Sequence, residues 1–146
     1  MLSHLNHLNI ILADDDEDDR SLFRDAIKKL QISSDLHMLN DGEKLMTYLC
    51  APAVIIPDII FLDLHMPRKN GIQCIHEIRE LTKYNQVPIV MFTLSGLPPH
   101  SSEPDAISTN LYVKKADTFP ALISLLAGIL IEDGKKALSE NTLKSK

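Results

Sequence analysis

The chain has 146 residues, of which 45% are hydrophobic and 24% charged, and its formal net charge is −5. These values are typical of a single soluble globular domain and exclude a fibrous or disordered protein and a second large domain. The negative charge argues against nucleic acid as the main partner, and every apolar run is far shorter than the roughly 20 residues that span a membrane.

The N-terminus and the two cysteines indicate the cell compartment. The first residues lack the positive start, apolar stretch and small-residue cleavage site of a secretory signal. Cys50 and Cys74 are isolated, which favours buried free thiols within helices over a disulfide or a metal pair. We therefore expect a cytoplasmic protein.

Short apolar runs alternate along the chain with segments of helical periodicity. The predicted strands are residues 9–13, 35–39, 58–62, 87–92 and 111–113, and the predicted helices are residues 18–30, 45–49, 72–81 and 119–130. Residues 98–110 contain three prolines and predict a loop with at most a short helix. This alternation predicts an α/β fold with a parallel sheet and right-handed crossovers.

Three segments follow from this organisation. We expect an N-terminal extension over residues 1–8, one domain over residues 9–131 and a polar C-terminal tail over residues 132–146 that is too short for an output domain.

Chemically active side chains stand directly after four of the predicted strands. Asp14 and Asp15 follow the first strand, Asp63 the third, Thr93 the fourth and Lys115 the fifth. Ligands of an open α/β sheet bind outside the carboxyl ends of its strands, so these side chains should share one crevice. Three ionised carboxylates repel one another and need a cation, and Mg²⁺ suits carboxylate, carbonyl, water and phosphate oxygens.

Each of these residues has an ordinary structural explanation when taken alone. Acids that open a helix are commonly a solvated terminus favoured by the helix dipole, and this is our interpretation of Asp16, Glu17, Asp18 and Asp19. An Asp, a Thr or a Lys after a single strand is also unremarkable. Their joint placement at four strand ends is what makes the pattern specific.

At these residues the chain resembles the receiver domain of bacterial two-component response regulators. The matching motifs are the acidic pair of Ile-Ile-Leu-Ala-Asp14-Asp15, the segment Phe-Leu-Asp63-Leu-His-Met-Pro67 with its loop to Gly71, the strand Ile-Val-Met-Phe-Thr93 and the ending Tyr112-Val-Lys-Lys115. The resemblance covers roughly residues 9–131. It implies a stand-alone, single-domain receiver with a flavodoxin-like, doubly wound (βα)5 fold, a five-stranded parallel sheet and strand order 2-1-3-4-5.

The resemblance also implies a role for each matching residue. Asp63 would accept a phosphoryl group from a sensor histidine kinase or a histidine phosphotransfer protein. Thr93 and Lys115 would bind phosphoryl oxygens, and Tyr112 would act as the switch residue. Mg²⁺ would be held by Asp15 and Asp63 directly, Asp14 through water, and the His65 backbone carbonyl. Such a protein is no enzyme beyond its own phosphorylation and dephosphorylation, and it signals by contact with a downstream protein.

The chain departs from the family pattern at three places. Ala116 replaces the proline, often in a cis bond, that usually follows the lysine. Leu94 occupies a position that is usually small and would restrict access to the phosphoryl group. The prolines between residues 97 and 104 leave little room for a regular fourth helix.

Two other functions compete with this interpretation. A haloacid-dehalogenase-like phosphatase would use Asp14 as nucleophile, with Asp16, Thr93, a lysine and the pair Glu132-Asp133. It would leave Asp63 unused and needs a strand where residues 119–131 have helical periodicity. A binding module of the same fold would lack the phosphoryl chemistry, which the intact set of acids, Thr93 and Lys115 disfavours.

The last helix suggests a homodimer through that helix and the fifth strand. Phe119, Leu122, Leu126 and Ile129 share one face, but Ile123, Leu125, Leu130 and Ile131 add apolar surface around the rest. Either a twofold partner covers this extra surface or Ile123 and Leu130 only widen the core-facing stripe.

Overall fold

The predicted strands form one five-stranded parallel sheet in the computed structural model, which describes residues 7–94 and 111–131. The strands are β1 (Leu8–Ala13), β2 (Ser34–Leu39), β3 (Ile59–Asp63), β4 (Ile89–Thr93) and β5 (Leu111–Lys114). Their order is β2-β1-β3-β4-β5, and every neighbouring pair is parallel. The expected flavodoxin-like topology is confirmed. The expected loop at residues 98–110 and the tail at residues 132–146 lie outside the described residues.

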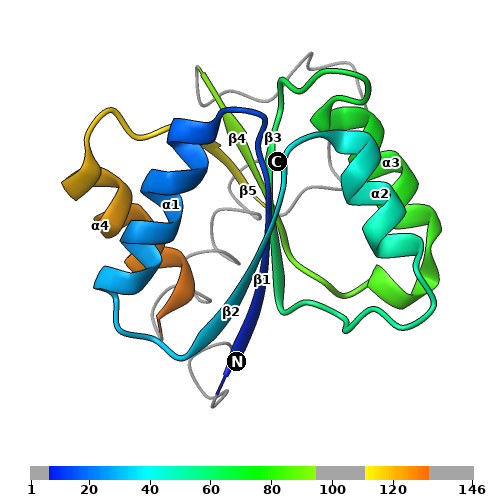
Figure 1. The fold of residues 1–146 in the computed structure, drawn as a ribbon, viewed down its shortest axis with the longest axis horizontal. Helices are drawn as coiled ribbons and strands as arrows, with labels where there is room; N and C mark the ends of the chain where they lie inside the picture. Colours follow the sequence, from blue (N-terminus) through cyan, green and yellow to red (C-terminus); the bar gives the residue numbers. More distant parts are fainter. Residues whose placement is uncertain (1–6, 95–110, 132–146) are drawn as a thin grey trace.

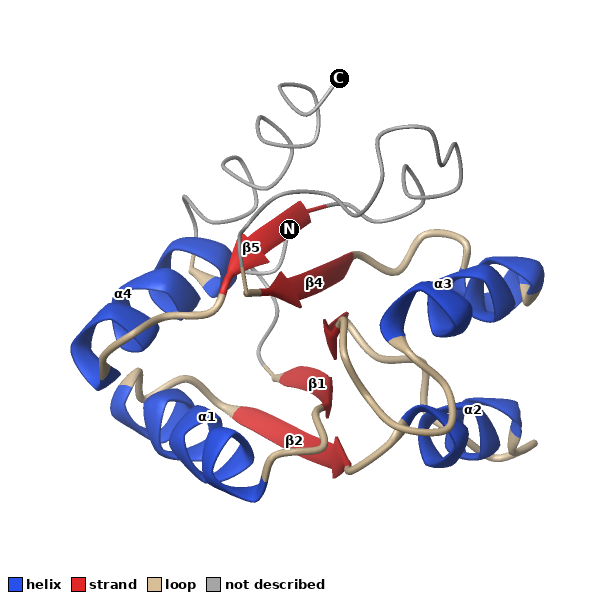
Figure 2. Ribbon diagram, turned by 90° about the horizontal axis from the view of Figure 1, so that it is seen from above, coloured by secondary structure: helices blue, strands red, loops and turns tan. Residues whose placement is uncertain are grey.

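Helices cover both faces of this sheet (Figures 1 and 2). In the described residues, α1 (Glu17–Lys29) and α4 (Phe119–Leu130) lie on one face, and α2 (Gly42–Cys50) and α3 (Gly71–Glu80) lie on the other, with a short 3₁₀ helix η2 (Thr82–Tyr84) after α3. A polar side chain at the N-cap begins each of the four α-helices by accepting a backbone N–H three residues on. These N-cap residues are Asp16, Asp41, Asn70 and Thr118.

Two apolar cores, one on each face, sandwich the sheet. All five residues of β3 are buried, as expected for a central parallel strand. On the α1–α4 side, the Phe23 ring packs edge-on against Phe61 at 5.0 Å, and Phe61 stacks on Phe92 at 5.7 Å. On the α2–α3 side, the buried Tyr84 hydroxyl donates to the Leu49 carbonyl at 2.6 Å. These cores fix the strand ends that carry the polar side chains.

The structure corrects some of the sequence-based expectations. β1 begins at Leu8, and β4 begins at Ile89 because Pro88 has no N–H for the ladder, although its carbonyl accepts from Ile60. Cys74 is buried as expected, but Cys50 is exposed, so that prediction was wrong. Cys50 is the last residue of α2 and falls outside the helix face that is buried through Leu45, Met46 and Leu49.

The last helix also differs in part from expectation. Leu126, Ile129 and Leu130 are buried, while Ile131 is 42% exposed. Leu130 therefore belongs to the core rather than to an uncovered second face, and Ile123 and Leu125 pack partly against the same core. Among the described residues, no helix is long and apolar enough to cross a membrane.

Candidate functional site

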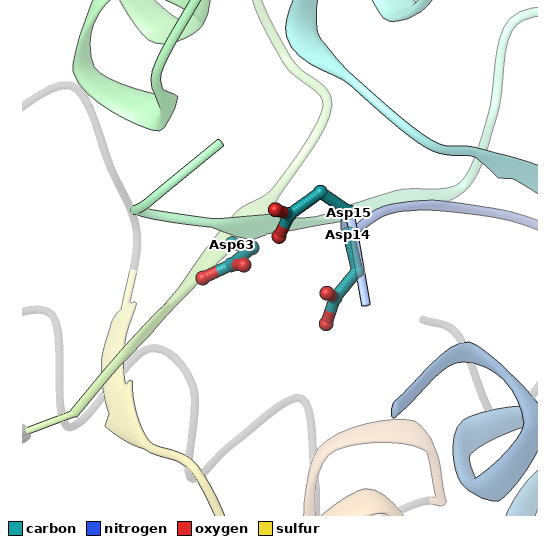
Figure 3. Close-up of side chains that lie close together, drawn as sticks. All are labelled: Asp14, Asp15 and Asp63. Carbon is teal, nitrogen blue, oxygen red and sulfur yellow. The ribbon is translucent and has the colours of Figure 1, made fainter. Parts of the chain in front are cut away.

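Three carboxylates meet where β1 and β3 end. Asp14 and Asp15 directly follow β1, and Asp63 is the last residue of β3 (Figure 3). One oxygen from each carboxylate lies within 4.8 Å of the other two. Asp14 and Asp63 are buried and Asp15 is exposed, so the cluster opens to solvent on one side. This grouping was predicted from the strand ends.

Backbone hydrogen bonds orient the two buried carboxylates. The Asp14 carboxylate accepts the Asp16 N–H at 2.9 Å, and the Asp63 carboxylate accepts the His65 N–H at 3.3 Å. The Arg20 guanidinium donates to the Asp14 backbone carbonyl at 2.8 Å, which connects α1 to the end of β1. The acids therefore stand in fixed positions rather than on loose loops.

Thr93 and Lys115 complete the crevice from the next two strands. Thr93 is the buried last residue of β4, and its carbonyl accepts the Lys115 N–H at 2.9 Å. The Lys115 ammonium lies 3.5 Å from Asp63, 3.4 Å from Asp14 and 2.8 Å from Asp19. All the residues expected after the strand ends thus share one site.

The electrostatics of the site favour a bound cation. Burial and, after it, the neighbouring Asp14 charge raise the pKa of Asp63 to about 7, although Lys115 and the His65 N–H act to lower it. Burial also raises the pKa of Asp14. For Lys115, burial alone would lower the pKa, but the hydrogen bond with Asp19 and the charges of Asp14 and Asp63 raise it. Three hard oxygen donors that one lysine does not neutralise are the donor set that suits Mg²⁺ or Mn²⁺.

The loop after Asp63 is attached firmly to the start of α2. Arg68 has a φ of 66° and donates to the buried Asp41 carboxylate at 3.1 Å, while the Asp41 side chain also caps α2. A Cβ on Gly42 would lie 2.0 Å from the Lys69 carbonyl, so the two segments approach too closely for any side chain there. These contacts hold the backbone around His65 beside the acidic cluster.

The other residues singled out from the sequence are also placed. Tyr112 lies half-buried on β5 against the α2–α3 core, and Leu94 is 70% exposed. The described residues contain no cis peptide bond, so the Lys115–Ala116 bond is trans. Ala116 therefore replaces the usual proline without a cis peptide.

Sequence reasoning missed two contributions to the site. Asp19 was interpreted as a solvated helix-terminus acid, yet it makes the shortest contact of Lys115. Its place in the first turn of α1, directly after the residues that end β1, was the available signal. The Arg68–Asp41 pair joins residues 27 positions apart, and no local sequence pattern predicts it.

Comparison with known proteins decides the family. Residues 10–127 match the family model of the response regulator receiver domain. The chain belongs to this family. The receiver is 28% identical over 129 residues to the response regulator Rcp1 of Synechocystis sp., covering 82% of this chain and 84% of that protein. It is 31% identical over 87 residues to the transcriptional regulatory protein CpxR of Klebsiella pneumoniae, covering 60% of this chain and 34% of CpxR.

Solved structures give the same result for the receiver. The Mn²⁺-bound form of Rcp1 matches with a TM-score of 0.68 and 27% identity, over 84% of this chain and 91% of that one. The phosphorylated cyanobacterial phytochrome response regulator RcpA matches with a TM-score of 0.69 and 26% identity over the same shares. The receiver is thus a two-component signalling protein with a cluster of three acids at its strand ends, and the similar protein Rcp1 has been solved in a Mn²⁺-bound form.

The phosphatase alternative is set aside by these findings. The receiver family model spans the strand that ends in Asp63, which a phosphatase would leave unused. Residues 119–130 form a helix, and the Asp16 carboxylate caps α1 by accepting the Asp19 N–H at 3.0 Å instead of serving as a second catalytic acid. Glu132 and Asp133 lie outside the described residues.

Proposed function

We propose that this receiver accepts a phosphoryl group on Asp63 from a sensor histidine kinase or a histidine phosphotransfer protein. The observation that carries the proposal is the position of Asp63, buried at the end of the central strand between two carboxylates and the Lys115 ammonium. This position gives Asp63 both neighbouring carboxylates suited to a divalent cation and a lysine suited to phosphoryl oxygens.

In the proposed reaction, a carboxylate oxygen of Asp63 attacks the phosphorus of a phosphohistidine. The P–N bond breaks as the acyl phosphate forms, and the neutral imidazole leaves after taking up a proton. Mg²⁺ bound by Asp15, Asp63, the His65 carbonyl and, through water, Asp14 would neutralise the developing charge. Lys115 pairs with one phosphoryl oxygen, and the Thr93 hydroxyl donates to another.

The phosphorylated receiver would then signal by protein contact. Thr93 and Tyr112 lie on the adjacent strands β4 and β5, so a Thr93 hydroxyl drawn toward the phosphoryl group leaves space that Tyr112 can enter. The resulting change in the β5 surface would be recognised by a downstream protein. The cytoplasmic location and the division into residues 1–8, 9–131 and 132–146 stay predictions.

Intact mass spectrometry after incubation with acetyl phosphate and Mg²⁺ tests the phosphoacceptor. We expect the mass of one phosphoryl group to be added to the native chain and to Asp18→Asn, but not to Asp63→Asn. Asp18 is exposed and has no part in the proposed reaction, so this variant controls for a simple loss of acidic charge. An unmodified native chain, also with a phosphohistidine donor, would favour the alternative of a non-phosphorylated binding module.

We further propose a twofold homodimer through α4 and β5. The exposed Ile131 and the partly exposed Ile123, Leu125 and Val113 support it, although burial of Leu130 makes the available surface smaller than the sequence suggested. Sedimentation at several concentrations, with and without phosphorylation, tests the dimer. A monomer at hundreds of micromolar in both states would refute it.

A further inference from the structure

The Lys115 ammonium is shared among three carboxylates, two of which stand at strand ends and one of which belongs to a helix. Asp14 and Asp63 belong to the crevice at the ends of β1 and β3, whereas Asp19 lies in the first turn of α1. The distance to Asp19 is 2.8 Å, against 3.4 Å and 3.5 Å to the other two. The nearest counter-ion of the lysine is therefore an α1 residue that is not part of the acidic cluster of Asp14, Asp15 and Asp63.

The contact is better shielded than an ordinary surface ion pair. The Lys115 side chain is 25% exposed, and Asp19 is 40% exposed. The two residues line a small cavity between α1 and α4 whose walls include Leu22, Phe23 and Leu122. Partial removal from water makes such a pair stronger than the weak, fully exposed kind.

We propose that Asp19 is a positioning residue that holds Lys115 in the unphosphorylated protein and competes with the phosphoryl group for it. This inference rests on the proposed phosphorylation of Asp63. A phosphoryl group carries more negative charge than the carboxylate it replaces, so it attracts the ammonium away from α1. No proton is transferred in this step, because the lysine only exchanges one anionic partner for another.

The backbone of Asp19 is held at the start of α1. Its backbone N–H donates to the N-cap carboxylate of Asp16 at 3.0 Å, and the helix begins at Glu17. A lysine that moves toward the phosphoryl group thus weakens its ion pair with α1, and the Asp19–Lys115 pair stabilises the resting state relative to the phosphorylated state. Removal of the Asp19 charge should favour the phosphorylated state.

Beryllofluoride, which mimics a phosphoryl group on a carboxylate, allows a test at equilibrium. In saturating Mg²⁺, we expect Asp19→Asn to bind beryllofluoride about threefold to fivefold more tightly than the native chain, as ¹⁹F NMR or calorimetric titration would measure. Asp18→Asn removes the same charge from the same helix turn and makes no such contact, so its affinity should stay at the native value. A merely structural role for Asp19 would weaken binding instead.

The Lys115→Met background shows whether the effect passes through the lysine. Asp19→Asn should change the affinity in the native background and leave it unchanged when Lys115 is absent. Equal or weaker binding by Asp19→Asn, an equal gain in Asp18→Asn, or the same gain without Lys115 would each overturn the competition. Failure of the native chain to bind beryllofluoride and to be phosphorylated would instead overturn the proposed function, on which the competition depends.

Discussion

Replacement of Asp63 by asparagine should stabilise the protein in the absence of divalent cations, and increasingly so as the pH rises. The pKa of Asp63 is raised from 3.8 to about 7, first by burial and then by the charge of Asp14. Between these two values the folded chain keeps a proton that the unfolded chain has lost. The native state is therefore favoured at low pH, and this contribution is lost as the pH rises through about 7.

The size of the effect follows from the raised pKa. Each pH unit between the two pKa values costs about 1.4 kcal/mol of stability, so about 2 kcal/mol should be lost between pH ~5.5 and pH ~7. Asparagine has nearly the same shape and no charge to ionise. The difference in the free energy of unfolding between Asp63→Asn and the native chain should grow by about this amount over that range.

Urea unfolding in EDTA at a series of pH values measures this difference. Asp18→Asn serves as the control, because its carboxylate is exposed and the variant should follow the native pH dependence. Parallel curves for Asp63→Asn and the native chain would show that Asp63 titrates in the folded protein as it does in water. Lower stability of Asp63→Asn at pH 8 would refute the assigned repulsion among the acids.

Three further predictions follow from the site and its surroundings. Millimolar Mg²⁺ should raise the Tm of the native chain by occupying the acidic cluster, and an equal shift in Asp15→Asn would refute this. Gly42→Ala should destabilise the protein by about 1–3 kcal/mol, because the new Cβ would clash with the backbone of the loop after Asp63. Gly128→Ala should stabilise it by about 0.5–1 kcal/mol, because there is open space around this helix position. Urea unfolding of both variants measures the two changes. Leu94→Ala should lose its phosphoryl group faster than the native chain if Leu94 shields it, and equal rates by intact mass would reject that role.

The regular part of this molecule was predictable because one local rule governs it. Apolar runs ending in Asp14, Asp63 or Thr93 predict both the parallel strands and the edge of the sheet at which these residues meet. Contacts made by side chains of the helices and loops escape that rule. Asp19 is one acid among six consecutive ones. It differs from the exposed Asp18 only in the side of α1 on which it lies, which brings it to Lys115.

The loop after Asp63 shows a second limit of prediction. Arg68 adopts a left-handed backbone conformation although it is not glycine, and its partner Asp41 belongs to another helix. Neither property has a signature in the neighbouring residues. The burial of Cys50 was mispredicted for a related reason, because residue type favours an interior position while the turn of α2 places it outside.

The exposed thiol of Cys50 gives this chain a natural handle for spectroscopy. Cys74 is buried and burial raises its pKa to about 12, so a thiol-reactive dye at neutral pH should attach to Cys50 alone. Cys50 ends α2, on the opposite face of the sheet from α1 and α4 (Figure 1). A fluorophore or surface tether can thus be introduced without mutagenesis, on the opposite side of the sheet from α1 and α4.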